Sequence, residues 1–544
     1  MQKHLNYKKF IFLLYLFPLA TIAQTADTIF YNGKILTVDK DFSIEEAVAI
    51  SEDRILSVGS SDDILQMSSV NTRLINLEGK TVIPGIIDSH LHYLRGTNFA
   101  THETRIHGIT SKKEALSVIA EKASQLDANE WVFIFGGWSE GQFSDIPGGF
   151  TQEELDIASP NNPVFIQRTY SAFYMNSLAI EKIAPAVPHL YDGGSVIRTS
   201  SLEGREVMYA ALKYYPFATN EEERANEIKD FNEYLNSVGI TTVYDLGYLD
   251  GSYQPVSELA DRGELTVRAF YAQRYWADSP RTAIAAAELL ENEPPFKRDD
   301  FFGEYGIGEH VYGLLHDFPT TSEPFPQSVY DNFEVIALSA AKNGWQLNEH
   351  AMQEPTVVGM LDVFERISQS HSIDNLRWTI GHVDFISKSS IDRAKSLGLA
   401  LTVHNHTVKP IVKDRASPPI KDIQDSGILW GMGSDGTVVA TYNPFHTIWE
   451  YTAGMTFPDR QKYSKDQVIT REDALIAHTR SNAYLMFMED RIGTIEPNKY
   501  ADIVILDKDY LDISIDEIYT IKPILTMLSG NIVYQDSSQE KLWK

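Results

Sequence analysis

The stretch VIPGIIDSHLHYLRG, residues 82–96, is an apolar run that ends in two histidines separated by one residue. Because side chains at positions i and i+2 of a strand point to the same face, His90 and His92 can converge on one metal ion. In an isolated strand, the more common role of such a histidine is merely to close the strand. The metal interpretation therefore depends on whether other strands bring further ligands to the same place.

Seven further segments along the middle of the chain have the apolar character of short strands, and helical stretches separate most of them. The eight candidate strands are residues 81–88, 240–246, 265–272, 305–313, 345–349, 377–383, 399–405 and 428–434. Most neighbours are spaced close to the roughly 30 residues of one βαβ unit. This pattern predicts an α/β protein with a (β/α)8, TIM-like barrel, and a doubly wound open sheet is the alternative.

The two ends of the chain show a different sequence pattern. Apolar and polar residues alternate there in short candidate strands, which are separated by turn pairs such as Asn-Gly. Each end alone would leave its apolar face uncovered, so we predict one small β domain built from residues 24–83 and 487–544. The barrel would then occupy residues 84–486. The gap after its first strand is too long for a single crossover, which predicts an insertion of about residues 100–230. Insertions at the mouth of a barrel usually shape the substrate cavity.

Residues 1–23 have the layout of a cleavable secretory signal peptide: a basic stretch, an apolar run and then a small residue, Ala23. The run is short for a bilayer span and is interrupted by Pro18, which favours cleavage over an uncleaved membrane anchor. We therefore expect an exported protein that is periplasmic or secreted, with no membrane attachment after cleavage.

The composition excludes several classes of partner and chemistry. A formal net charge of −28 argues against nucleic acid or an anionic membrane as partner, because both would be repelled. The chain has no cysteine, which rules out disulfides, thiolate metal sites, cysteine nucleophiles and a lipid-modified cysteine. Any metal must therefore be held by histidine, aspartate or glutamate. The composition is compatible with a homo-oligomer.

Three later strands also end in a candidate metal ligand. His350 and His382 each close an apolar strand and lie one βα unit apart, so their imidazoles are expected to be neighbours on one rim. Asp435 follows the eighth strand and is flanked by glycines, which lets its carboxylate approach other groups closely. Four imidazoles and one carboxylate suit zinc, manganese or iron better than calcium or magnesium. We therefore predict that His90 and His92 belong to a divalent metal site of one or two ions, with zinc as the first choice.

With these residues in view, the chain resembles the amidohydrolase superfamily. The resemblance rests on PGIIDSHLH, NEH, GHV and GSDG, and on TREDALIAHTRSNAYLM near the end of the barrel. It continues into GTIEPNKYADIVILD and LSGNIVY, which resemble the β-sandwich tail of the family. Within the insertion, LDIASPNNPVFIQRTYSAFYMNSLAI is similar to the amidohydrolase family 3 branch, which contains N-substituted formamide deformylases. The resemblance implies that the small β domain is a β-sandwich and that the protein is a metal-dependent hydrolase of a small molecule.

The chain departs from this family pattern at two places, the fourth strand and Ser171. Relatives with two metals bridge them with a carboxylated lysine or a glutamate on the fourth strand, whereas FFGEYGIGEHVYGLL contains no lysine. Glu309 falls where the bridge would lie, with Glu304 as the other carboxylate on offer and a one-metal site as the alternative. Relatives often carry a substrate-binding histidine where Ser171 stands, so that role is not transferred. His404 and His406 form a second HxH on the seventh strand, which supplies no ligands in the family, and we interpret them as cavity lining or structure.

The resemblance implies cleavage of a non-peptide C–N bond in an N-acyl or N-formyl amide. In such a reaction the metal activates water and polarises the carbonyl, and Asp435 acts as the general base. Asp88 shares a face with His90 and is a candidate hydrogen-bond partner for its ring. One alternative is a deaminase of a heterocyclic amine, although Gln353 stands where family deaminases carry a glutamate. The other is a non-catalytic envelope protein that binds a metal or a solute.

Overall fold

The computed structural model describes residues 25–542 except 248–251, 276, 406–416, 458–459 and 461–465. The predicted signal peptide and His406 therefore lie outside the described residues. Within the described ranges, every helix is too short or too polar to cross a membrane.

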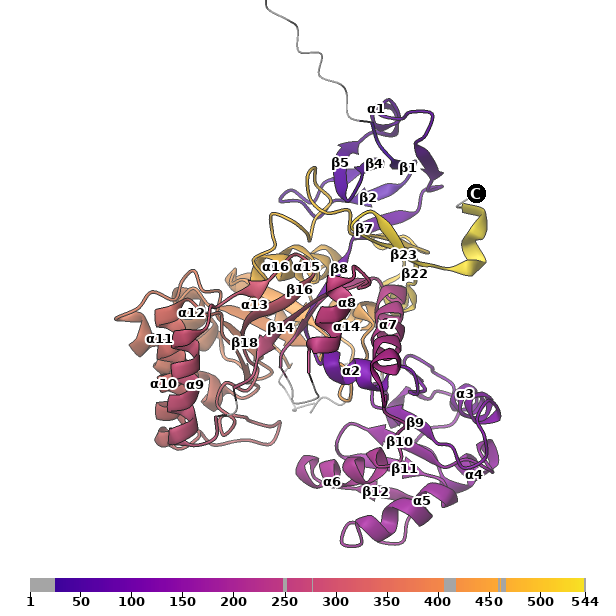
Figure 1. The fold of residues 1–544 in the computed structure, drawn as a ribbon, viewed down its shortest axis with the longest axis vertical. Coiled ribbons are helices and arrows are strands. Elements are labelled where there is room, and N and C mark those ends of the chain that lie inside the picture. The colour runs from indigo at the N-terminus through magenta and orange to yellow at the C-terminus, as the bar shows by residue number, and fades with distance from the viewer. Residues whose placement is uncertain are drawn as a thin grey trace, which may run out of the picture.

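Eight parallel strands occupy the centre of the molecule in two sheets (Figure 1). The first sheet contains β8 (Ile86–Leu91), β13 (Ile240–Asp245), β14 (Arg268–Gln273) and β16 (Phe302–Ile307). The second contains β17 (Asn348–Ala351), β18 (Thr379–His382), β19 (Ala400–His404) and β20 (Trp430–Gly433). A parallel bridge between Ile307 and Leu347 joins the two sheets. Each of the eight predicted strands corresponds to one of these strands.

Helices alternate with these strands, as expected for βα units. They include α7 (Glu221–Ser237), α8 (Gln254–Asp261), α9 (Pro280–Asn292), α10 (Gln327–Asn343), α11 (Glu354–Ser368), α12 (Lys388–Ser396), α13 (Ile420–Ser426) and α14 (Pro444–Ala453). Apolar faces of these helices and the strands merge into one large hydrophobic cluster, in which Phe333, Phe364 and Trp378 are fully buried. The centre of the chain is therefore an α/β fold of the TIM-barrel-like kind.

The first and last of the eight strands meet through hydrogen bonds at their C-terminal ends. The Asp435 amide donates to the His90 carbonyl, and the His92 amide donates to the Gly436 carbonyl, both at 2.7 Å. A Cβ atom at Gly433 would lie only 2.7 Å from the His90 amide nitrogen, so this close approach requires glycine. This junction between the C-terminal ends of β8 and β20, called the seam below, brings the predicted ligands of strands one and eight close together.

Two of the differences from the predicted strand boundaries bear on the site. Residues 81–88 form two strands, because β7 (Thr81–Pro84) ends before Gly85, whose amide donates to the Asp502 carbonyl at 2.8 Å. β7 pairs with β2 and β21 of a terminal sheet, and only β8 belongs to the central set. The fourth strand ends at Ile307, so Glu309 lies in the loop beyond it. The sequence pattern could not show this end, because burial continues from the strand into the loop.

Segments from both ends of the chain form two β-sheets at one pole of the molecule, where the indigo and yellow parts of Figure 1 meet. One sheet has the order β23-β22-β21-β7-β2-β3 and so mixes N- and C-terminal strands. Its further strands are β2 (Lys34–Leu36), β3 (Ile44–Glu45), β21 (Ile503–Leu506), β22 (Pro523–Leu528) and β23 (Asn531–Gln535). The other sheet consists of β5 (Arg54–Gly59), β4 (Ala47–Ser51), β1 (Thr28–Tyr31) and β6 (Arg73–Asn76). Side chains of both sheets, such as Val48 and Ile503, share one hydrophobic cluster.

The segment between β8 and β13 forms a lobe with its own sheet at the opposite pole (Figure 1). This sheet consists of β9 (Val132–Phe135), β10 (Val164–Arg168), β11 (Ala172–Met175) and β12 (Val196–Arg198). Its helices are α3 (Lys112–Ser124), α4 (Gln152–Ala158), α5 (Ser177–Ile183) and α6 (Ser201–Leu212), and α2 (Tyr93–Phe99) leads into the lobe. The turn between β10 and β11 and the start of α6 face the mouth of the central strands.

A buried ion pair connects the central strands to the terminal sheets. Arg268 on β14 is fully buried, and its guanidinium contacts both carboxylate oxygens of Asp502 at 3.1 and 3.2 Å. We expect Asp502→Ala to lower the free energy of unfolding by about 3–5 kcal/mol, because it leaves the Arg268 charge buried without its counter-ion. A denaturant titration followed by tryptophan fluorescence measures this loss.

An exposed ion pair provides the control for that variant. Glu334 and Arg366 form a pair on the surface, and Glu334→Gln should cost no more than about 1 kcal/mol because solvent screens the charges. Equal losses for the two variants would show that the buried pair has no special structural role.

Candidate metal centre and its cavity

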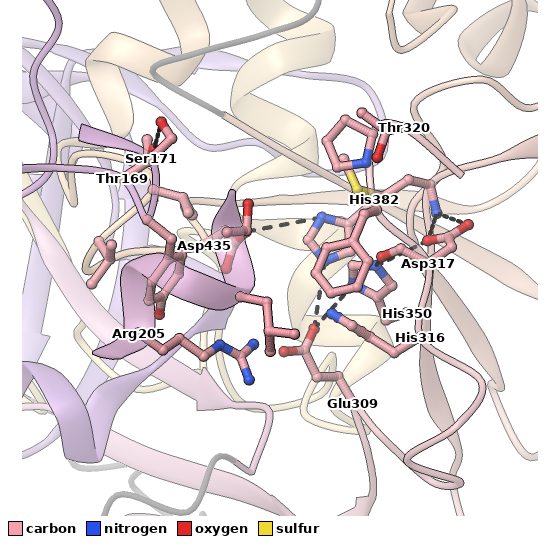
Figure 2. Close-up of a pocket in the computed structure, with 18 of the residues that line it drawn as sticks. Thr169, Ser171, Arg205, Glu309, His316, Asp317, Thr320, His350, His382 and Asp435 are labelled. Atoms are coloured by element: carbon pink, nitrogen blue, oxygen red, sulfur yellow. Dashed lines mark hydrogen bonds and ion pairs between the residues drawn. The ribbon is translucent and has the colours of Figure 1, made fainter. Parts of the chain in front are cut away.

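The Glu309 carboxylate lies among the four predicted histidines, of which Figure 2 labels His350 and His382. Its Oε2 atom lies 3.3 Å from His90 Nε2 and 3.5 Å from His382 Nε2. The same oxygen lies 3.7 Å from His350 Nδ1, and Oε1 lies 3.7 Å from His92 Nε2. One carboxylate therefore contacts imidazoles that come from three different strand ends.

Asp435 approaches the same histidines from β20. Its Oδ1 atom lies 3.3 Å from His92 Nε2 and 3.7 Å from His90 Nε2, and its Oδ2 atom lies 3.9 Å from His382 Nδ1. Asp435 and His382 have positive φ angles of 58° and 72°, a conformation that costs roughly 1–3 kcal/mol for a residue with a side chain. This backbone geometry turns both side chains inward, so the structure brings all six predicted site residues together.

The donor atoms fit a divalent metal. Nitrogen and oxygen atoms of His90, His92 and Asp435 lie within 4.8 Å of one another, as do those of Glu309, His350 and His382. His90 is fully buried, and its Nδ1 atom has no hydrogen-bond partner among the described residues, while its Nε2 atom lies against the Glu309 carboxylate. Burying a polar nitrogen without a partner is costly, and a bound cation would remove that cost. Imidazole and carboxylate donors in this ratio match zinc, manganese or iron.

Two of the pKa shifts favour the forms that bind metals. Burial opposes ionisation of Glu309, but the neighbouring His90 and His310 rings hold the pKa of its carboxyl well below the ordinary value. Burial and the adjacent His350 lower the pKa of His382 to about 3. The cluster therefore presents a carboxylate and a neutral imidazole at neutral pH, which are the states that a metal needs.

Asp317 is a site residue that sequence reasoning missed. It is fully buried, its Oδ1 lies 3.0 Å from His350 Nε2, and its carboxylate accepts the amides of Met352 and Gln353 at 2.8–3.1 Å. Burial opposes a charged His350, yet the Asp317 and Glu309 carboxylates raise the pKa of this imidazole well above its usual value. Asp317 thus fixes the ring with Nδ1 turned toward Glu309. It stands in an irregular loop, where no periodicity marks it.

We expect Asp317→Asn to lower metal affinity about 10- to 100-fold, because a ligating imidazole loses the carboxylate that orients it. Competition with a metal-binding dye measures the affinity, and metal analysis after dialysis measures retention. The exposed Asp331→Asn on α10 is the control for loss of one negative charge. Unchanged affinity in the Asp317 variant would assign this carboxylate to loop structure alone.

Two further predictions about neighbouring residues are corrected or refined. Asp88 accepts the backbone amides of His90 and Ser434, both at 3.0 Å, so it organises the backbone at the seam rather than the His90 ring. Burial raises the pKa of Asp88 to about 6.

His404 is buried, its ring lies 4.1 Å from that of His90, and its nitrogen belongs to a third donor group with His90 and His382. It does not line the cavity of the described structure, which leaves a role inside the cluster.

A cavity of about 560 Å³ opens beside these ligands. The central strands and their loops supply one wall, with His92, His350, His382, Glu309 and Asp435. The lobe supplies the other wall, with Thr169, Tyr170, Ser171, Ser200, Ser201, Leu202 and Arg205. A volume of this size accommodates a small organic molecule. The arrangement can therefore place a substrate bond next to a metal and next to the Asp435 carboxylate.

Comparisons with known proteins agree with this geometry. A family described as "Amidohydrolase family" matches residues 73–534. The chain is 27% identical over 523 residues to the protein LONG AFTER FAR-RED 3 of Arabidopsis thaliana, covering 90% of this chain and 88% of that protein. It is 24% identical over 550 residues to N-substituted formamide deformylase of Arthrobacter pascens, covering 94% and 99%. The crystal structure of a metal-dependent hydrolase of Pyrococcus furiosus superposes with a TM-score of 0.60 at 21% identity, covering 89% of this chain and all of that one.

Proposed function

Because the chain belongs to the amidohydrolase family, a family of metal-dependent hydrolases, we propose that it cleaves a non-peptide C–N bond in an N-acyl or N-formyl amide. The observation that carries the proposal is the Glu309 carboxylate in contact with four buried imidazoles at the wall of a substrate-sized cavity. The similarity to N-substituted formamide deformylase supports the choice of an amide.

The six ligands divide into two groups that share one centre. His90, His92 and Asp435 would hold one divalent ion, and His350 and His382 would hold a second, with Glu309 between them. Zinc is the first choice and manganese or iron are alternatives, given the imidazole-rich donor set. A divalent ion at this position supplies Lewis acidity, which lowers the pKa of water and polarises a carbonyl oxygen.

Residues of the chain itself transfer the proton, orient a metal ligand and exclude water from the cavity. Asp435 lines the cavity and accepts the proton of the attacking water, then returns it to the leaving nitrogen as general acid. Asp317 keeps His350 in its ligating orientation. Met352 and Val438 add apolar surface to the cavity, which reduces water access and strengthens the electrostatic interactions inside it.

The deaminase alternative lacks the glutamate that family deaminases use as a proton shuttle, because Gln353 stands at its position. Gln353 donates to the Phe318 and Pro319 carbonyls at 3.4 and 3.0 Å, and it does not line the cavity of the described structure. Glu354 accepts the Ser387 amide and the Ser390 hydroxyl, both at 2.8 Å, so its carboxylate is engaged outside the cavity. Neither residue can act as a proton shuttle in this arrangement.

Turnover on a panel of N-formyl and N-acyl amines, with aminopyrimidines alongside, tests the proposal. We expect release of amine from the amides only, and loss of activity after chelation that the added divalent metal restores. Ammonia from the aminopyrimidines would indicate a deaminase. Tight metal binding without turnover of any compound would indicate a non-catalytic metal- or solute-binding protein.

We extend the proposal to the architecture of the chain and to its location. The eight parallel strands are proposed to close into one barrel of residues 84–486, and the two terminal sheets to form one β-sandwich domain of residues 24–83 and 487–544. The shared core of the two sheets and the seam at β8 and β20 support this division. Export is proposed from the composition of residues 1–23. Mature protein from the native host should begin near Gln24, and an intact Met1 would contradict cleavage.

A further inference from the structure

The lobe wall of the cavity carries positive charge in a strongly acidic protein. The chain has 75 acidic and 47 basic residues, yet Arg95 and Arg205 both line this cavity. They are its only lysine or arginine side chains among the described lining residues. Arg95 comes from α2 and Arg205 from α6, so two separate elements deliver these guanidinium groups.

Arg205 points into the cavity from the side opposite His350 and Asp317 (Figure 2). It is half-buried, and no carboxylate of the described residues lies within ion-pair distance of its guanidinium. Its closest recorded partner is the Tyr170 ring, with 5.7 Å between Cζ and the ring centroid. A partly desolvated guanidinium of this kind retains most of its hydrogen-bond donors for a ligand.

Tyr170 connects the two arginines. Arg95 is buried, and its Nη1 donates to the Tyr170 hydroxyl at 3.0 Å, while the face of the same ring lies beside Arg205. Tyr170 stands at the β10–β11 turn, next to Thr169 and Ser171, whose hydroxyls are 3.0 Å apart. The wall therefore combines the Arg205 guanidinium, beside a tyrosine whose hydroxyl accepts from Arg95, with the Thr169 and Ser171 hydroxyls, the chemistry that binds a planar oxyanion.

The charge balance of the cavity points the same way. The ligand wall of the cavity holds the Glu309, Asp317 and Asp435 carboxylates, whose charge bound divalent ions would offset, whereas the Arg205 guanidinium on the opposite wall has no carboxylate of the described residues within ion-pair distance. We propose that the lobe wall is a subsite for a carboxylate carried by the amide substrate, so that acidic amides are preferred over their neutral counterparts. This inference rests on the proposed amide hydrolysis. It assigns Arg205 the role of contacting the carboxylate, with Tyr170 as its support.

Matched pairs of amides that differ only in a carboxylate test the inference. We would compare 4-(formamidomethyl)benzoate with N-benzylformamide, and N-formylphenylalanine with N-formylphenethylamine, using the metal-loaded full-length enzyme. In at least one pair, kcat/KM should favour the acid about 10- to 100-fold, the range expected for a hydrogen-bonded charge pair. Arg205→Met should bring this ratio close to one, and Arg205→Lys should restore part of it.

Lys182→Met is the matched control, because it removes a positive charge from an exposed position of the same lobe, outside the cavity. It should leave the acid-to-neutral ratio unchanged, and metal content and melting temperature of each variant verify folding. Amide hydrolysis without a preference for the acid in either pair, or a ratio that Arg205→Met does not change, would overturn the inference and leave the proposed function standing. Failure to hydrolyse any of the amides would overturn both.

Discussion

Glu309→Gln is expected to lower the metal content from about two ions per chain to about one and to reduce kcat/KM roughly 10³-fold. Two divalent ions a few ångströms apart repel each other unless an anion lies between them. The Glu309 oxygens lie 3.3–3.7 Å from His90, His92, His350 and His382, which places this carboxylate between both ligand groups. A glutamine side chain at this position keeps the shape of glutamate but lacks its negative charge. Metal analysis by mass spectrometry and steady-state kinetics on the best amide measure the two effects.

Glu304→Gln is the control for this variant. Glu304 is equally buried and belongs to the same segment, but it lies on β16 and shares no donor group with the described histidines. It should keep wild-type metal content. If Glu309→Gln also keeps its full metal content and rate, Glu309 is not a bridge, and a site with one tightly held metal becomes the better description.

Much of the ligand set could be predicted because it depends on a simple rule of parallel sheets. Residues at the carboxyl ends of neighbouring strands lie on one rim, so His90, His350, His382 and Asp435 had to be near one another once the strands were recognised. The observed register, with Ala351 opposite His382 and His404 opposite Gly433, follows the same rule. Apolar runs that end in one polar residue carry this information locally.

The remaining parts of the site depend on contacts that no local pattern records. Asp317 stands in the loop after β16 and reaches His350 only through the path of that loop. Asp88 shares a face with His90, as alternation predicts, but its carboxylate contacts backbone amides because β20 approaches so closely at Gly433. Arg205 reaches the cavity because the lobe packs over the strand ends, and its sequence neighbourhood is that of an ordinary exposed helix.

Asp435→Asn is expected to reduce kcat about 10²- to 10⁴-fold, the range that general acid–base catalysis contributes, with a much smaller change in KM. The Asp435 carboxylate lines the cavity and lies 3.3 Å from His92, so it can hold the reacting water and accept its proton. Asparagine retains a ligating oxygen and cannot accept the proton. Metal content should therefore fall by much less than the rate, and parallel metal analysis and kinetics separate the two roles.

Asp384→Asn provides the comparison, because Asp384 is also buried near this rim but accepts the Ser417 hydroxyl at 3.0 Å and does not line the described cavity. Its rate should stay within a few-fold of wild type. If the Asp435 variant instead loses metal and rate in proportion, and added metal restores both, the carboxylate acts only as a ligand. The proton would then have to be accepted elsewhere, and His310, which lies 3.3 Å from Glu309 on the same cavity wall, would be the next residue to test.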